Sequence, residues 1–160
     1  MGNYTEYHFK IRLKKPLPPF VHAVLVITNH PVGDLSSYVK HIEENAEHDF
    51  FRCDRWIWMF HQHHGYKVSS YRADQSGHCS LELHGQNKDW DDEIQMFSDW
   101  IKPYIVGRKS KIYLGWRKGD YAYNAPVFHC WYLPSTEKIV WGTSFESATE
   151  FNAVKKHNTQ

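Results

Sequence analysis

Apolar and basic side chains alternate near the start of the chain. In residues 6–14, every second side chain is large and apolar, and most of the side chains between them are basic. The apolar set is Tyr7, Phe9, Ile11 and Leu13, and the basic set is His8, Lys10, Arg12 and Lys14. A period of two places alternate side chains on opposite faces of a β-strand. The segment therefore predicts a half-buried strand with one apolar and one cationic face.

Apolar side chains recur every three or four positions in residues 35–46 and in residues 90–102. This spacing gathers them on one face of a helix. An aspartate stands where each helix needs an N-cap, Asp34 before the first and Asp89 before the second. Pro103 is expected to kink or end the second helix.

The remaining apolar segments predict strands. A dense run of large side chains predicts a buried strand at residues 55–62, and the polar stretch at residues 63–77 is expected to be a loop or hairpin. The other predicted strands are 78–84, 111–117, 126–133 and 138–142. In the strand at 111–117, the side chains expected to point inward are Ile112, Leu114 and Trp116.

The order of these elements, together with a short helix at residues 19–28, predicts an α+β fold. A βαββαβ succession is typical of a ferredoxin-like split βαβ core, to which residues 126–142 add a C-terminal hairpin. Helices then cover one face of the antiparallel sheet, and the other face is free unless the hairpin or a partner covers it. The 160 residues are expected to form a single domain over 1–152 and a frayed tail at 153–160.

Composition narrows the possible partners. Aromatic residues make up 16% of the chain and include seven Trp, so many rings must lie in the core or at a contact surface. A net charge of +1 does not favour binding to duplex DNA or to an anionic membrane. The three cysteines are odd in number, unlike a disulfide framework, and no long apolar stretch is present. Together these features indicate a soluble, cytoplasmic protein.

Several segments resemble a family of small bacterial proteins. They are Phe50–Trp56, Leu81–Leu83, Lys88–Ile94 and Trp100–Ile105, with the opening Tyr4–Phe9 and the later Gly115–Trp116. The resemblance covers pieces of residues 4–117, and the chain departs from it at Pro19 and Phe20. The family has no established activity, so the likeness implies a shared fold and origin and leaves the function open.

A histidine-rich segment raises the question of a metal site. His61, His63 and His64 lie close together, and Cys53 and Cys79 are possible further ligands. Zinc needs three or four such ligands in a tetrahedral arrangement. Adjacent histidines rarely converge on one ion, so the expectation is a polar strand end without a metal or other cofactor.

Another segment resembles half of an enzyme motif. His78 and Ser80, followed by Leu81, fit the His-x-Ser/Thr-apolar pattern of the 2H phosphoesterases, which present an acid and a base from two such motifs. The closest second copy, at His8, has Lys10 in place of the hydroxyl residue. A 2H-like phosphoesterase stays one alternative, and a solvent-facing strand histidine is the other.

The cationic side of the first strand is a candidate binding surface. It consists of His8, Lys10, Arg12 and Lys14, and Tyr113, Arg117 and His84 are expected to share its face of the sheet. Stacking and positive charge together bind single-stranded nucleic acid or a nucleotide. The alternative is an ordinary solvated strand face.

The leading hypothesis is a non-catalytic module that binds another protein, as inhibitors, immunity proteins and counter-defence proteins do. Residues 118–126 are predicted to form an exposed loop, and the aromatic residues around it are of the kind that interfaces enrich. The residues expected to bind the partner are Arg117, Asp120, Tyr121, Tyr123 and Trp131. A satellite core is the alternative for this cluster.

Overall fold

The computed structural model describes residues 4–30, 35–61, 69–73, 77–89, 91–119 and 124–151. Its strands are β1 (Thr5–Leu13), β2 (Ser70–Ala73), β3 (Cys79–Asn87), β4 (Ile112–Gly119), β5 (Val127–Leu133), β6 (Lys138–Gly142) and β7 (Thr149–Glu150). Its α-helices are α1 (Pro19–Leu25), α2 (Ser36–Asn45) and α3 (Glu93–Ile101). Its 3-10 helices are η1 (Val26–Asn29), η2 (Asp49–Arg52), η3 (Trp56–Met59) and η4 (Lys102–Tyr104). The predicted cap Asp34 and the predicted tail at 153–160 lie outside the described residues.

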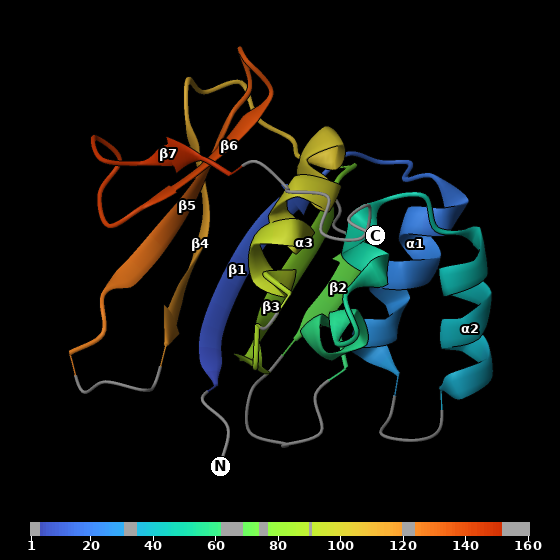
Figure 1. Ribbon diagram of the computed structural model, residues 1–160. Coiled ribbons are helices and arrows are strands. Elements are labelled where there is room, and N and C mark those ends of the chain that lie inside the picture. The colour runs from blue at the N-terminus through green and yellow to red at the C-terminus, as the bar shows by residue number, and fades with distance from the viewer. Residues whose placement is uncertain are drawn as a thin grey trace.

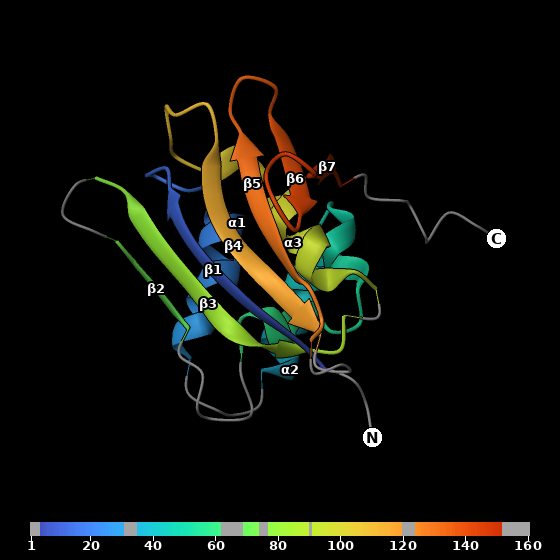
Figure 2. The ribbon, with the colours of Figure 1, turned by 90° about the vertical axis from the view of Figure 1, so that its left-hand side faces the viewer.

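In the described part of the chain, seven strands form one antiparallel sheet in the order β2-β3-β1-β4-β5-β6-β7. The three α-helices lie on one side of this sheet (Figure 1). The opposite side faces the viewer in Figure 2, and none of the described helices covers it. We call the two sides the covered face and the open face. The predicted α+β class, with helices on one face of an antiparallel sheet, is confirmed.

Strand β1 lies between β3 and β4, and its side chains alternate between the two faces. Its apolar side chains, Tyr7, Phe9, Ile11 and Leu13, point into the core and are at most 3% exposed. The alternation predicted for residues 6–14 is therefore confirmed, and it places His8, Lys10 and Arg12 on the open face.

Aromatic rings fill the core between the sheet and α3. Phe9 packs against Phe97 with ring centroids 5.0 Å apart, and Phe97 and Ile94 are fully buried. Phe50 in η2 stacks on Trp100 of α3 at 5.7 Å. Edge-to-face and offset contacts of this kind stabilise a core beyond the apolar area that they bury.

The strand predicted at residues 55–62 is wrong, because Trp56–Met59 forms the 3-10 helix η3. Trp56 and Met59 are buried, whereas Ile57 and Trp58 between them are partly exposed. This is the three-residue period of a 3-10 turn. A short apolar run does not distinguish a buried strand from a buried turn. The hairpin expected within residues 63–77 is confirmed in part, because β2 pairs with β3.

The inward direction predicted for Trp116 is also wrong. The register between β4 and β5 shifts between Tyr113 and Gly115, and Leu114 and Gly115 are both buried. Such a bulge adds one residue and reverses the alternation that follows it. A Cβ atom at Gly115 would overlap the carbonyl oxygen of His8, so glycine is needed at this close approach. Trp116 consequently pairs with His8 on the open face.

Helix α3 begins at Glu93, three residues later than the predicted start. Asp92, and not Asp89, is the N-cap residue, although Oδ1 of Asp89 accepts the backbone N–H of Ile94 in the first turn at 3.1 Å. The α-helix ends at Ile101, and Pro103 lies in the 3-10 turn that follows, as the sequence indicates. Among the described residues, no helix has the length and apolar character needed to cross a membrane.

Candidate functional site

A row of rings crosses the open face from β3 to β5. It consists of His84, His8, Trp116, His129, Tyr113 and Trp131, with Phe145 at its far end, and we call it the ring row. At its first end, His8 and His84 stack with centroids 4.5 Å apart and an interplanar angle of 23°. Trp116 meets both imidazoles edge-on, at 6.2 and 6.3 Å.

The other half of the ring row lies on β4 and β5. His129 is paired with Trp116 across the two strands, so the row continues without a gap in register. Tyr113 lies 5.7 Å from Trp131, and its hydroxyl is 2.6 Å from Nδ1 of His129. The side chain of Tyr113 is 47% exposed, which is unusual for a ring of this size. Phe145 closes the row 5.5 Å from Trp131.

Positive charge accompanies the rings. Lys10, Arg12 and Lys118 share the open side of β1 and β4 with the ring row. Two acidic side chains of this face approach an imidazole: Glu6 lies 3.1 Å from His84, and Glu82 lies 3.8 Å from His8. Lys10 and Arg12 are exposed, and Lys118 is half-buried.

The surroundings of His8 favour its neutral imidazole. Burial against its neighbours lowers its pKa from 6.5, and the nearby His84 lowers the pKa further. Glu82 opposes this shift without reversing it. The neutral form of His8 carries a smaller desolvation cost than the cation, and its ring stacks on His84.

A cavity of about 630 Å³ opens on the same face at the β2 edge of the sheet. We call it the edge cavity. Its polar lining consists of Lys10, Arg12, Ser70, Arg72, Ser80 and Glu82. Arg12, Ser80 and Arg72 are direct cross-strand neighbours on β1, β3 and β2. The strands thus place Ser80 between two arginines on the same face.

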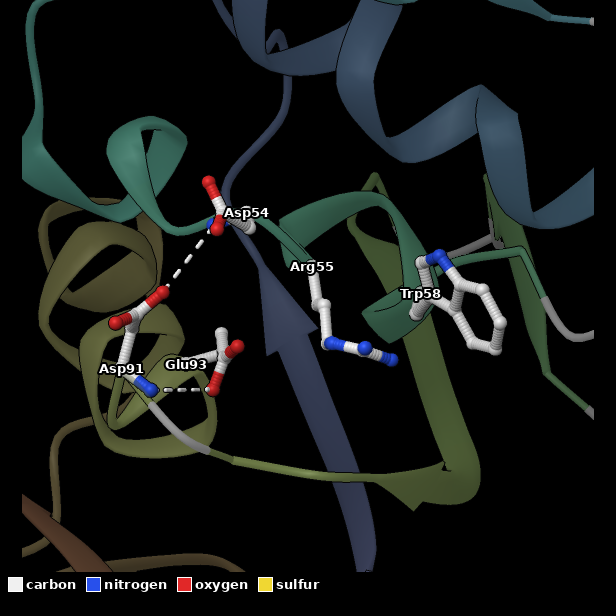
Figure 3. Close-up of a pocket in the computed structure, with 5 residues that line it drawn as sticks. All are labelled: Asp54, Arg55, Trp58, Asp91 and Glu93. Atoms are coloured by element: carbon white, nitrogen blue, oxygen red, sulfur yellow. Dashed lines mark hydrogen bonds between the residues drawn. The ribbon is translucent and has the colours of Figure 1, made fainter. Parts of the chain in front are cut away.

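A second pocket, of about 350 Å³, lies between η3 and the start of α3 on the covered side (Figure 3). It is lined by Asp54, Arg55, Trp58, Asp91 and Glu93. The backbone N–H of Asp54 donates to Oδ2 of Asp91 at 3.3 Å, and the backbone N–H of Asp91 donates to Oε2 of Glu93 at 3.2 Å. The first of these bonds links the η3 segment to the start of α3, and the guanidinium of Arg55 lies 5.7 Å above the ring of Trp58.

Buried carboxyl groups surround this second pocket. Burial raises the pKa of Asp89 to about 7, although the Ile94 N–H and the Arg117 guanidinium 3.8 Å away partly stabilise its charged form. Burial also raises the pKa of Glu93, whose Oε1 has no hydrogen-bond partner among the described residues. The same burial, with nearby carboxylates, raises the pKa of the Cys53 thiol to about 12, which makes it unreactive. The described contacts indicate a structural role for this cluster, which joins η3 to α3.

The surface predicted to bind a protein is only partly described. Asp120, Tyr121 and Tyr123 lie outside the described residues, and Trp131 lies in the ring row on the open face. Arg117 was expected on the same sheet face as His8, and that placement is wrong. It pairs with Tyr7 on the covered face, where its guanidinium lies 4.9 Å above Phe128 and 5.7 Å above Trp141. The β4 bulge is the cause, because it reverses the direction of every later side chain in the strand.

Three of the four residues predicted to bind nucleic acid lie on one surface. His8, Lys10 and Arg12 lie together on the open face, and His84 joins them. Lys14 follows the end of β1, and its Nζ donates to the carbonyl of Pro103 at 3.0 Å. The first three residues thus form one surface, whereas Lys14 is directed toward the η4 turn.

The histidine-rich segment and the half-motif give no assembled site. His61 is buried, and His63 and His64 lie outside the described residues. Within the described ranges, no group of three His, Cys, Asp or Glu side chains is placed to hold a metal ion. Cys53, Cys79 and Cys130 are buried free thiols.

The phosphoesterase alternative stays a prediction. Ser80 lines the edge cavity, as a hydroxyl that contacts phosphate would. The described lining of that cavity does not include His78.

Sequence reasoning missed Arg72, Trp116 and His129. Arg72 lies in a four-residue strand inside a polar stretch, where the only signal is Tyr71 between Ser70 and Arg72. Trp116 was predicted to point inward and His129 was not assigned to a surface, because the sequence pattern does not reveal the β4 bulge that places them opposite each other on the open face.

Fold and surface together define an α+β protein with an aromatic and cationic open sheet face. No family model matches the chain, and comparisons with curated proteins and with solved structures give no match either. The resemblance to a family of small bacterial proteins accordingly stays a prediction.

Proposed function

We propose that this protein binds single-stranded nucleic acid on its open face, without catalysing a reaction. The observation that carries the proposal is the ring row, which runs across the four adjacent strands β3, β1, β4 and β5 beside Lys10, Arg12 and Lys118. Exposed rings stack on bases of any sequence, and cations beside them neutralise the phosphates of the backbone.

The small net charge of the chain is consistent with this proposal. Duplex binding needs a broad basic surface, whereas stacking on single-stranded bases supplies affinity that does not depend on charge. The covered side holds the acidic cluster of Asp54, Asp91 and Glu93, whereas Lys10, Arg12 and Lys118 lie on the open face.

We further propose that β1, α1, β2, β3, α3 and β4 form a ferredoxin-like split βαβ unit, with β5, β6 and β7 extending its sheet. The strand order β2-β3-β1-β4 and the antiparallel pairings support this assignment. Sheets of this kind bind single-stranded RNA on their uncovered face in other proteins.

Binding of a protein partner is the second candidate function, and Tyr113 is the observation that favours it. Its exposed ring, with Trp131 and Phe145, forms an aromatic patch of the kind found at the centre of interfaces. Lys111 lies 4.1 Å above the ring of Phe145 and would form the polar rim of such a patch.

Fluorescence anisotropy with labelled ten-nucleotide DNA and RNA strands, measured over a salt series, tests the proposal. Single strands are expected to bind with a salt-dependent affinity, and a duplex of the same sequence is expected to bind more weakly. Equal binding of duplex and single strands, or no binding to either, would contradict the proposal. A Trp131→Ala variant that loses a co-purifying protein but keeps its oligonucleotide affinity would favour the second candidate.

A further inference from the structure

We infer that the edge cavity holds a terminal phosphate monoester of the nucleic-acid strand that lies on the ring row. This inference rests on the proposed function and names the chemical group that fixes the end of the ligand. It is carried by three features of the cavity: the register of its side chains, its net charge and its position beside the rings.

The register brings donors toward one point from three strands. Ser80 on β3 is the cross-strand neighbour of Arg12 on one side and of Arg72 on the other. Strands lie about 4.8 Å apart, so the backbones of the two arginines are about 10 Å apart with the serine midway. Guanidinium groups reaching inward from that separation can donate from both sides to an anion above the Ser80 hydroxyl.

The charge of the cavity matches a dianion. Among the described residues that line it, Lys10, Arg12 and Arg72 are cationic and Glu82 is anionic, so three positive charges against one negative charge leave +2. A phosphate monoester carries a charge of about −1.5 to −2 at pH 7, whereas a phosphodiester within a strand carries −1. The cavity is therefore better matched to a terminal phosphate than to an internal one.

The position of the cavity suits the end of a bound nucleic-acid strand. The ring row begins at His8 and His84, and Lys10 and Glu82 are the next residues along β1 and β3 that face the same side. Two residues along a strand span about 7 Å, so the cavity adjoins the first stacked rings. Beyond it lies β2, the edge of the sheet, which contributes Ser70 and Arg72 to this face.

The test compares three forms of one labelled ten-nucleotide strand, with a 5′-phosphate, with a 3′-phosphate and with neither. Wild-type protein is expected to bind one phosphorylated form at least about tenfold more tightly than the unphosphorylated form, as charge-assisted hydrogen bonds at one site would give. Arg72→Gln is expected to abolish that difference. The matched control is Arg52→Gln, which removes one exposed cation from the η2 turn and is expected to preserve the difference.

Equal affinity for all three forms, or a preference that survives Arg72→Gln, would overturn the inference while leaving the proposed function intact. If no form binds, the proposed function fails, and ribose 5-phosphate then tests the cavity alone. Amide shifts at Arg12, Arg72 and Ser80 that appear with ribose 5-phosphate but not with ribose would support a phosphate site. Their absence would overturn it.

Discussion

The two faces of the sheet use aromatic side chains in opposite ways. On the covered face, Phe9, Phe97 and Trp100 are at most 6% exposed and pack against one another. On the open face, Tyr113 is 47% exposed, and histidines and cations stand among the rings. The aromatic side chains of this chain therefore have two roles. One set packs in the core and stabilises the fold, and the other set forms a surface.

The faces also differ in how they place charge. On the covered side, Asp89 and Glu93 are buried at the start of α3, where their pKa values are raised. On the open face, the carboxylates of Glu6 and Glu82 are partly exposed beside histidines. Substitutions on the covered side should therefore change stability, whereas those on the open face should change binding.

Replacing one ring on each face gives the largest expected effect. Phe97→Ala is expected to lower the free energy of unfolding by about 3–5 kcal/mol, because it leaves a cavity among fully buried rings. Tyr113→Ala is expected to lower it by less than about 1 kcal/mol, because nearly half of its side chain is exposed. Urea denaturation of both variants measures the difference, and equal losses would show that the open-face ring belongs to the core.

The buried carboxyl of Asp89 makes stability depend on pH. Its pKa rises from 3.8 to about 7 on folding, so its contribution is fully present below about pH 3.8 and is lost as the pH rises through 7. Asp89→Asn keeps an acceptor for the Ile94 N–H and removes the ionisation. The variant is expected to gain roughly 2–4 kcal/mol relative to wild type between pH 4 and pH 8. Denaturation at both pH values measures this gain, and a constant difference would contradict the assignment.

Two tryptophans, one on each face, separate binding from folding. Trp116→Ala is expected to weaken oligonucleotide binding by about 1–3 kcal/mol, because one stacking ring is lost from the open face. Trp58→Ala removes a partly exposed ring from the second pocket, between η3 and α3, and serves as the matched control. Anisotropy titrations measure both affinities, and equal weakening by the two changes would argue against a binding role for the open face.

The smallest expected effect is on the salt dependence of binding. Lys10→Gln is expected to reduce the slope of log affinity against log salt concentration by about 0.7, the value for one phosphate contact with a single strand. Lys40→Gln removes an exposed lysine from α2, where Lys40 approaches Glu44 at 3.9 Å, and should leave the slope unchanged. Identical slopes for Lys10→Gln and wild type would mean that Lys10 contacts no phosphate.

The sequence was informative where one simple period governed a whole element. Strand β1 alternates over its full length, so its two faces and three of its four basic residues could be placed in advance. The apolar stripe of α3 likewise identified Ile94 and Phe97 as core residues, and both are fully buried.

The failures of prediction have local physical causes. In η3, a 3-10 turn buries Trp56 and Met59 within an apolar run that also suits a strand. In β4, a single bulge moved Trp116 to the open face and Arg117 to the covered face, and no periodicity reveals one extra residue. The candidate site was therefore predicted on β1 and β3 and at Tyr113 of β4, but the positions of Trp116 and His129 were not.

The most direct test of the central claim is an amide chemical-shift titration of the protein with a ten-nucleotide single strand. Binding on the open face predicts shifts at His8, His84, Trp116 and His129, with little change along α2 and α3. Shifts confined to the helices, or no shifts at saturating oligonucleotide, would contradict the assignment of the open face as the nucleic-acid surface.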